Sequence, residues 1–288
     1  MKTLLSLALL LTFSPTIAQS EVPLIGPGVS QDTPAFQLAF DSRFKNATKA
    51  DFKKMLTDQQ ISVEAWTSGI NASGVEFICL GERHDNTFRK RISEQILSGL
   101  DFDTLMIEAN QPETEKLAEE VAQGKETINH LGADFANILR AAKKRNPNLK
   151  LAGIEETKEQ EHARRDAPQY QRDSSIAENL MNGYAPGNRQ VAIYGALHCG
   201  NNSVSMSFQR PFYQHISKIV DADKRINALV VIDSDWNNKF SVYMTMLELS
   251  DKSFVIPDTA AVDPALYNFN WDLRQYFDNY KTIIFLTK

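Results

Sequence analysis

Hydrophobic positions along the chain form short runs of strand length that alternate with longer amphipathic stretches. The apolar, β-branched runs predict strands at residues 75–80, 104–107, 149–154, 190–194, 228–232, 240–247 and 282–286. Amphipathic stretches predict helices at 88–100, 113–123, 134–144 and 169–181. Strands separated by helices of this size form parallel βαβ units with helices on both faces of the sheet. The pattern therefore predicts an α/β fold with a mostly parallel central sheet.

Local signals refine this prediction. Ile92, Ile96 and Leu100 recur at four-residue spacing, as expected for one face of a helix. Pro112 precedes an acidic helical stretch and suits a first-turn position. The run at 240–247 follows that at 228–232 across the short segment Asp235-Trp236-Asn237-Asn238, so we expect a hairpin and some antiparallel pairing toward the C-terminus. With no linker-like composition after residue 20, we expect one domain over 19–288.

The first eighteen residues resemble a secretory signal peptide. Lys2 supplies a positive start, residues 4–13 are almost entirely apolar, and Ala18 closes a small-residue cleavage pattern. The apolar run is too short to span a membrane, and no cysteine follows the cut to accept a lipid. We expect a periplasmic or secreted protein without a transmembrane segment.

Composition and charge narrow the function. The chain has 288 residues, is 42% hydrophobic and carries a formal charge of −5, values that exclude a disordered or fibrous protein. An acidic chain without a long basic run is a poor nucleic-acid binder. The short basic runs at 89–91 and 143–145 are interpreted as solvated helix faces. We expect a small-molecule or peptide substrate; the oligomeric state stays open.

Titratable residues follow four consecutive predicted strands. The first ends in the sequence GERHD, which carries Glu82 and His84, and the second ends in Glu108. The third ends in Glu155-Glu156 and the fourth in His198. The carboxyl ends of parallel strands meet at one edge of a sheet, where open α/β folds bind ligands. The sequence predicts a functional site there; the alternative is a set of solvated turns.

Both histidines close a G-x-x-H pattern directly after an apolar strand. The two segments are GERH, which begins at Gly81, and GALH, which begins at Gly195. A glycine at such a turn lets the backbone bend sharply and approach a ligand closely. Two occurrences, each at a strand end, indicate a shared role for the imidazoles.

These motifs resemble one superfamily, which unites ChaN-type haem-binding uptake proteins, erythromycin esterases and TraB/TIKI proteases. The sequence LGERHDN at 80–86 is similar to its opening motif, and MIE at 106–108 to its next strand. RDSSIAEN at 172–179 resembles its RD-x-x-M-A-x-N helix, with Ile176 in place of Met. YGALH at 194–198 and FDNYKTIIF at 277–285 complete a match that runs in order over residues 75–288.

Two branches of this superfamily imply hydrolysis. The esterase branch implies a metal-free site in which His84 or His198 is the general base, Glu82 or Glu108 its partner, and Arg172 the oxyanion stabiliser. The TIKI branch implies a divalent transition metal (Zn, Mn, Fe or Co) held by His84, His198 and Glu82. An ordinary ion pair along its own helix is the alternative interpretation of Arg172. Hydrolysis of an ester or peptide is the leading hypothesis.

The ChaN branch implies a haem- or iron-binding envelope protein without catalysis. A haem site needs an apolar slot and an axial ligand. The aromatic residues that could line a slot are Tyr267, Phe269, Trp271, Tyr276, Phe277 and Tyr280. Core packing is the alternative for this cluster. A third hypothesis is an interaction module that has lost its chemistry.

The remaining candidates are the cysteines, two aspartates and three histidines. Cys79 and Cys199 either bridge in an oxidising compartment or stay buried thiols, and a thiolate metal ligand at Cys199 is less favoured. Asp233 and Asp235 follow another strand and would extend the acidic edge. The other histidines are interpreted as packing or surface residues: His130, His162 and His215. Phosphate-loop, serine-hydrolase elbow and zincin motifs are absent from the sequence.

Overall fold

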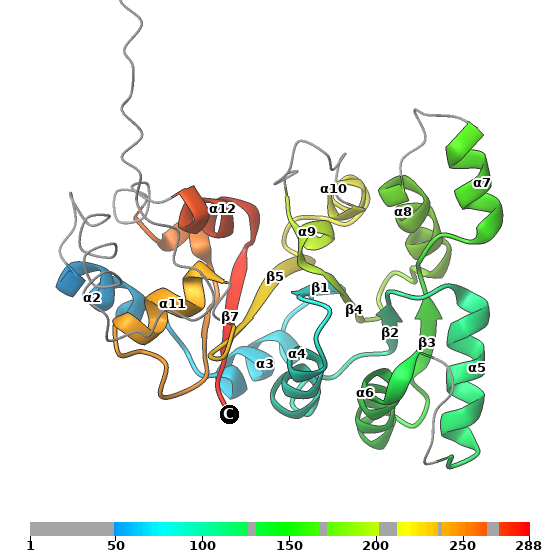
Figure 1. The fold of residues 1–288 in the computed structure, drawn as a ribbon, viewed down its shortest axis with the longest axis horizontal. Helices are drawn as coiled ribbons and strands as arrows, with labels where there is room; N and C mark the ends of the chain where they lie inside the picture. The colour runs from blue at the N-terminus through cyan, green and yellow to red at the C-terminus, as the bar shows by residue number, and fades with distance from the viewer. Residues whose placement is uncertain (1–48, 126–130, 167–171, 202–211, 236–237, 264–270) are drawn as a thin grey trace, which may run out of the picture.

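The computed structural model describes residues 49–125, 131–166, 172–201, 212–235, 238–263 and 271–288. Predictions for the signal peptide at 1–18 and for His130, Tyr267 and Phe269 lie outside these ranges, as does the side chain of Trp271. Within them, strands form one sheet of order β3-β2-β4-β1-β5-β7-β6 (Figure 1). The strands are β1 (Phe77–Glu82), β2 (Thr104–Ile107), β3 (Lys150–Gly153), β4 (Gln190–Gly195), β5 (Arg225–Ile232), β6 (Phe254–Ile256) and β7 (Thr282–Leu286).

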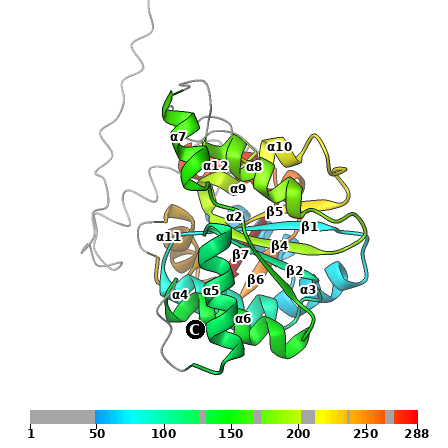
Figure 2. The same ribbon diagram turned by 90° about the vertical axis from the view of Figure 1, so that its right-hand side faces the viewer.

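Helices cover both faces of this sheet, as the two perpendicular views in Figures 1 and 2 show. On one side lie α3 (Val63–Asn71), α4 (Asn86–Arg91), which continues as the π-helix η1 (Ile92–Leu97), and α6 (Gly132–Arg145), with α5 (Gln111–Ala122) beside β3. On the other lie α8 (Arg172–Gly183), α9 (Ala196–Cys199), α10 (Phe212–Ile216) and α12 (Trp271–Asn279). The other described helices are α2 (Lys49–Gln59), α7 (Lys158–Asp166), α11 (Lys239–Met246) and η2 (Thr259–Ala261). The α/β prediction is confirmed.

Two apolar clusters hold the layers together. Along β1, Ile78 and Leu80 join the cluster under α3, α4 and α6, whereas Phe77 and Cys79 join the cluster under α8 and α10. Successive strand residues point to opposite faces, so a strand covered on both sides is apolar at every position. This burial explains the continuous hydrophobic runs that predicted the strands.

The strand prediction at 240–247 is wrong, because this segment forms helix α11. The Asn238 side chain accepts a hydrogen bond from the Phe240 N–H at 2.9 Å, which caps the helix start. Phe240, Tyr243, Met244 and Leu247 are buried, and their spacing of three and four residues is helical. The expected antiparallel pairing does occur, between β6 and β7 rather than in the predicted hairpin.

The other predicted elements are present, most of them with shifted ends. The helix predicted at 88–100 begins after Asp85, whose carboxylate accepts from the Thr87 N–H at 2.6 Å. Asn110 caps α5, and Pro112 occupies its first turn as expected. Among the described residues, no helix is long and apolar enough to cross a membrane.

A disulfide joins Cys79 on β1 to Cys199 on α9, with a Cα–Cα distance of 5.7 Å. Both cysteines are fully buried. The bond settles the question that the sequence left open between a disulfide and buried thiols. It also leaves no thiolate at Cys199 to bind a metal.

Candidate active site

The carboxyl ends of β1 to β4 lie at one edge of the sheet, because these strands are parallel neighbours in the order β3-β2-β4-β1. This edge carries the predicted residues Glu82, His84, Glu108 and His198. Arg172 reaches them from the first turn of α8. The structure thus brings together the five residues predicted as catalytic.

His84 lies between two carboxylates and is about half exposed. Its Nδ1 is 3.5 Å from Glu82 Oε1, and its Nε2 is 3.4 Å from Glu108 Oε2. Contact with Glu82 raises the pKa of His84; burial opposes this effect, and the charge of Glu108 adds to it. The backbone φ of 27° is unusual for a residue with a side chain. Such a conformation costs on the order of 1 kcal/mol or more and is typical of functional sites.

Gly195 makes room for the His84 ring. A Cβ atom at this position would lie 2.8 Å from His84 Nε2 and 3.4 Å from His198 Cδ2. The glycine of the second G-x-x-H segment therefore lets the imidazole of the first segment approach β4. This is a specific steric reason for the motif, beyond the turn that the sequence suggested.

An arginine whose side chain is 12% exposed fixes Glu82. Arg89 donates through Nε and Nη2 to Glu82 Oε1 at 3.2 and 3.1 Å, and through Nη1 to Asp134 Oδ2 at 2.6 Å. Its guanidinium also stacks over the Phe135 ring at 4.1 Å. The interpretation of residues 89–91 as a solvated helix face is therefore wrong for Arg89. It is likewise wrong for Arg91, which is buried and paired with Asp233.

Arg172 lies at the centre of the remaining groups. It donates to Glu155 Oε1 through Nε and to Glu108 Oε1 through Nη2, each at 3.0 Å. A second bond from Nη2 reaches the other Glu155 oxygen. Burial lowers the pKa of Arg172, but the Glu155 contact and neighbouring charges outweigh it, so the pKa is raised and the group stays cationic. These partners lie on strand ends, so the alternative of a pair along its own helix does not hold.

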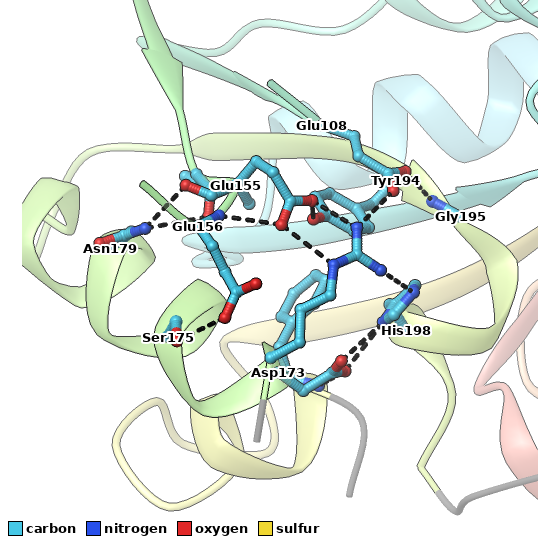
Figure 3. Close-up of polar contacts among 12 residues, drawn as sticks. Glu108, Glu155, Glu156, Asp173, Ser175, Asn179, Tyr194, Gly195 and His198 are labelled. Carbon is cyan, nitrogen blue, oxygen red and sulfur yellow. Dashed lines mark hydrogen bonds and ion pairs between the residues drawn. The ribbon is translucent and has the colours of Figure 1, made fainter. Parts of the chain in front are cut away.

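His198 is buried, and contacts at both of its ring nitrogens hold the imidazole in one orientation (Figure 3). Its Nδ1 is 2.9 Å from both Asp173 oxygens, one of which also accepts from the Phe212 N–H at 2.7 Å. An ionised carboxylate only accepts, so Nδ1 carries the proton and Nε2 is an acceptor. Arg172 Nη1 lies 3.2 Å from that Nε2 and donates to it. In this arrangement His198 positions Arg172.

Three members of the network were not among the residues predicted as catalytic: Asp173, Glu155 and Tyr194. The Tyr194 hydroxyl donates to Glu155 (Figure 3), and burial together with the Glu155 charge raises the pKa of Tyr194. The pKa of Glu155 is lowered, because its contacts with Arg172 and Tyr194 exceed the opposing effect of burial. Asp173 directly follows Arg172 in the RD motif, and this position in the motif is the sequence feature that could have identified it as a site residue.

The predicted metal ligands do not fit a metal site in this arrangement. Within the described ranges, no group of three or more His, Cys, Asp or Glu side chains is arranged to hold a metal ion. His84 faces carboxylates with both ring nitrogens, and His198 Nε2 faces a guanidinium. The cationic position between His198 and Glu108 is taken by Arg172.

The remaining candidates lie around this site rather than in it. Asp235 pairs with Arg83. Glu156 turns toward α7 and α8, where it contacts Arg164 and Ser175. Exposed His162 makes none of the site's contacts. Among the described aromatic residues, Phe277 and Tyr280 are buried in the core cluster and Tyr276 packs against it, which matches the core-packing alternative.

Comparisons with known proteins establish the fold. No family model and no curated protein matches the sequence. A structural-genomics protein from Bacillus cereus is similar over 84% of this chain and 98% of its own, at 11% identity and a TM-score of 0.59. A succinoglycan biosynthesis protein is similar over 84% and 97%, at 9% identity and 0.58. A mutant of the erythromycin esterase EreC in its open conformation covers 85% and 96%, at 11% identity and 0.49. The first two likenesses show a shared fold and do not extend to chemistry.

Proposed function

We propose that this chain is an exported hydrolase that adds water to an ester, or a peptide, at the carboxyl edge of its sheet. The observation that carries the proposal is the position of His84. Its half-exposed imidazole lies between Glu82 and Glu108, and Glu108 also binds the Arg172 guanidinium. The resemblance of residues 80–86 to the opening motif shared by ChaN-type proteins and erythromycin esterases, and of residues 172–179 to a helix of the same superfamily, is consistent with this assignment.

His84 is the general base. Glu82, fixed by Arg89, faces Nδ1 and favours the tautomer that carries its proton there. Nε2 then accepts a proton from water. The imidazolium that forms lies between two carboxylates, so the charge that develops in the transition state is stabilised where it appears.

Arg172 supplies the opposite charge. Of its five N–H groups, Nε, one on Nη1 and two on Nη2 have partners among the described residues. Within the part of the chain that the structure describes, the second N–H on Nη1 has no partner, and we assign it as the donor to a substrate oxygen. Because its partners fix the guanidinium in advance, stabilising an oxyanion needs little reorganisation.

The reaction follows from these roles. The water oxygen bonds to the carbonyl carbon while its proton passes to His84 Nε2, and the carbonyl oxygen becomes an oxyanion beside Arg172. Collapse of this intermediate breaks the bond to the leaving oxygen or nitrogen. His84 returns the proton to that leaving group, and the products are an acid and an alcohol or amine.

The test is turnover of an ester panel by purified protein and its His84→Ala variant. The panel comprises nitrophenyl esters, lactones and short peptides, followed by release of chromophore or acid. We expect His84→Ala to abolish turnover. The matched control is His162→Ala, because this exposed histidine contacts none of the site residues. Equal turnover in wild type and folded His84→Ala would refute the assignment of the base.

Two other predictions from the sequence have direct tests. Elemental analysis of wild type beside the His84→Ala/His198→Ala double variant tests the metal site that the TIKI-type resemblance implied. Stoichiometric metal in wild type alone would replace the mechanism above with a metal-dependent one. A haem titration tests the ChaN-type alternative, in which a Soret shift indicates binding.

A further inference from the structure

Helix α9 carries His198 but is only four residues long. So short a helix is not stable by itself, since nucleation is unfavourable and few internal hydrogen bonds form. Its position must therefore come from contacts with the rest of the chain. Three such contacts hold its two ends.

At the start of α9, the Tyr280 hydroxyl donates to the Ala196 carbonyl at 2.7 Å. At its end, the Asn227 side-chain amide donates to the Cys199 carbonyl at 3.0 Å. The Cys79–Cys199 disulfide fixes the same end covalently to β1. Tyr280, Asn227 and both cysteines are buried, and Ala196 is partly buried.

The disulfide also joins the two G-x-x-H segments. Cys79 lies two residues before Gly81, and Cys199 directly follows His198. A Cβ on Gly81 would lie 2.9 Å from the Ala196 Cα and 3.3 Å from the Cys199 Cβ. The start of the first G-x-x-H segment is therefore in direct contact with α9, and the disulfide lies where the two segments meet.

We propose that the Cys79–Cys199 disulfide and Tyr280 are positioning residues of the site. Together they fix α9 so that His198, oriented by Asp173, accepts the hydrogen bond from Arg172 and aims the guanidinium. The catalytic consequence rests on the function proposed above. The ordering of α9 is independent of it.

The proposal links completion of the site to oxidation of the chain. Forming the bond converts two thiols to a disulfide and releases two protons and two electrons. A thiol–disulfide oxidant, such as glutathione disulfide, takes them up and becomes two reduced thiols. Before this step α9 is held by the Tyr280 and Asn227 hydrogen bonds and by the contacts of His198 itself, so His198 and Arg172 are less well fixed.

The first experiment counts thiols in the denatured wild-type chain with a thiol-reactive chromophore. We expect none, whereas two free thiols would overturn the proposal. The second compares wild type with Cys79→Ala/Cys199→Ala and with Tyr280→Phe. Tyr184→Phe is the matched control, because it removes a hydroxyl that binds Glu76 at the opposite edge of the sheet.

The readout is the low-field proton NMR signal of the His198 Nδ1–H that faces Asp173. We expect a slowly exchanging signal in wild type and Tyr184→Phe. In the other two variants we expect faster exchange with water, together with a fall in kcat of about tenfold at nearly constant KM. Unchanged exchange and kcat in a folded disulfide variant would overturn the proposal.

Two further outcomes keep the test decisive. If the disulfide variant does not fold, Tyr280→Phe decides the role of Tyr280 alone, because it removes a single oxygen atom. The disulfide is then tested with reduced wild-type protein, after circular dichroism has shown that this protein keeps its native fold. If wild type hydrolyses no member of the panel, the proposed function fails. The exchange rate of the His198 proton then decides the positioning role by itself.

Discussion

Gly195→Ala is the most specific perturbation that the site allows, because it adds one methyl group against the His84 ring. The added Cβ would lie 2.8 Å from Nε2 and 3.1 Å from Cε1 of His84. The backbone φ of Gly195 is −52°, a value that alanine adopts without strain. The substitution therefore acts through contact with the imidazole and not through the turn.

The size of the effect follows from the contact distance. Non-bonded carbon and nitrogen atoms are in van der Waals contact at about 3.5 Å, so the His84 ring must shift by about 0.7 Å. A misplacement near 1 Å costs on the order of 10²-fold in rate. We expect kcat to fall by about ten- to a hundredfold with KM little changed. The His84 side chain is 55% exposed and can move into solvent, so we expect stability to change by less than about 1 kcal/mol.

Steady-state kinetics on the best ester of the panel, with a urea melt alongside, measures both quantities. Gly74→Ala is the control, because a Cβ there would have no neighbour within 4 Å. Wild-type kcat in a folded Gly195→Ala variant would refute the placement of His84 as the base.

Two further predictions concern charge. Contact with Glu82 raises the pKa of His84 above 6.5, burial opposes this shift, and the charge of Glu108 adds to it. A general base must be neutral to accept a proton, so we expect kcat/KM to rise with pH through a midpoint above 6.5. Glu82→Gln should move that midpoint down, and an unmoved midpoint would contradict the assignment. The same raised pKa contributes stability that is complete below 6.5 and is lost as pH rises through the folded-state value, which urea melts across pH detect. Arg89→Gln leaves the buried Glu82 carboxylate and the partly buried Asp134 carboxylate without their shared partner, so we expect a loss of about 3 kcal/mol in the free energy of unfolding. Lys90 is exposed, so Lys90→Gln should change the free energy of unfolding by less than about 0.5 kcal/mol. Equal effects of the Arg89 and Lys90 substitutions would contradict the role of Arg89.

The sheet was predictable where strands are covered on both faces. Residues 104–107 and 282–286 match β2 and β7 at both ends, because every position in them is buried. The run at 240–247 is just as apolar, yet it forms α11. A run of this length suits a strand or a buried helix equally, and the Asn238 cap and the packing of α11 decide between them.

The sequence predicted which edge of the sheet carries the site, but not the network of hydrogen bonds and ion pairs within it. Parallel topology alone brings His84, Glu108 and His198 to one edge. The partners of Arg172 lie 17 to 64 residues away in sequence, so only the folded chain reveals them. The partly buried position of Arg89 has the same origin, because it depends on Asp134 of α6 lying beside α4.

The central position of β1 has a consequence for how the chain is made. β1 pairs with β4 and β5, which begin at Gln190 and Arg225, more than a hundred residues later in the sequence. During synthesis both edges of β1, and its face that packs under α8 and α10, therefore stay uncovered until those later segments have been made. Non-local pairing of this kind slows folding and leaves an aggregation-prone edge exposed. We expect refolding to be slow and sensitive to protein concentration, with chaperones improving its yield.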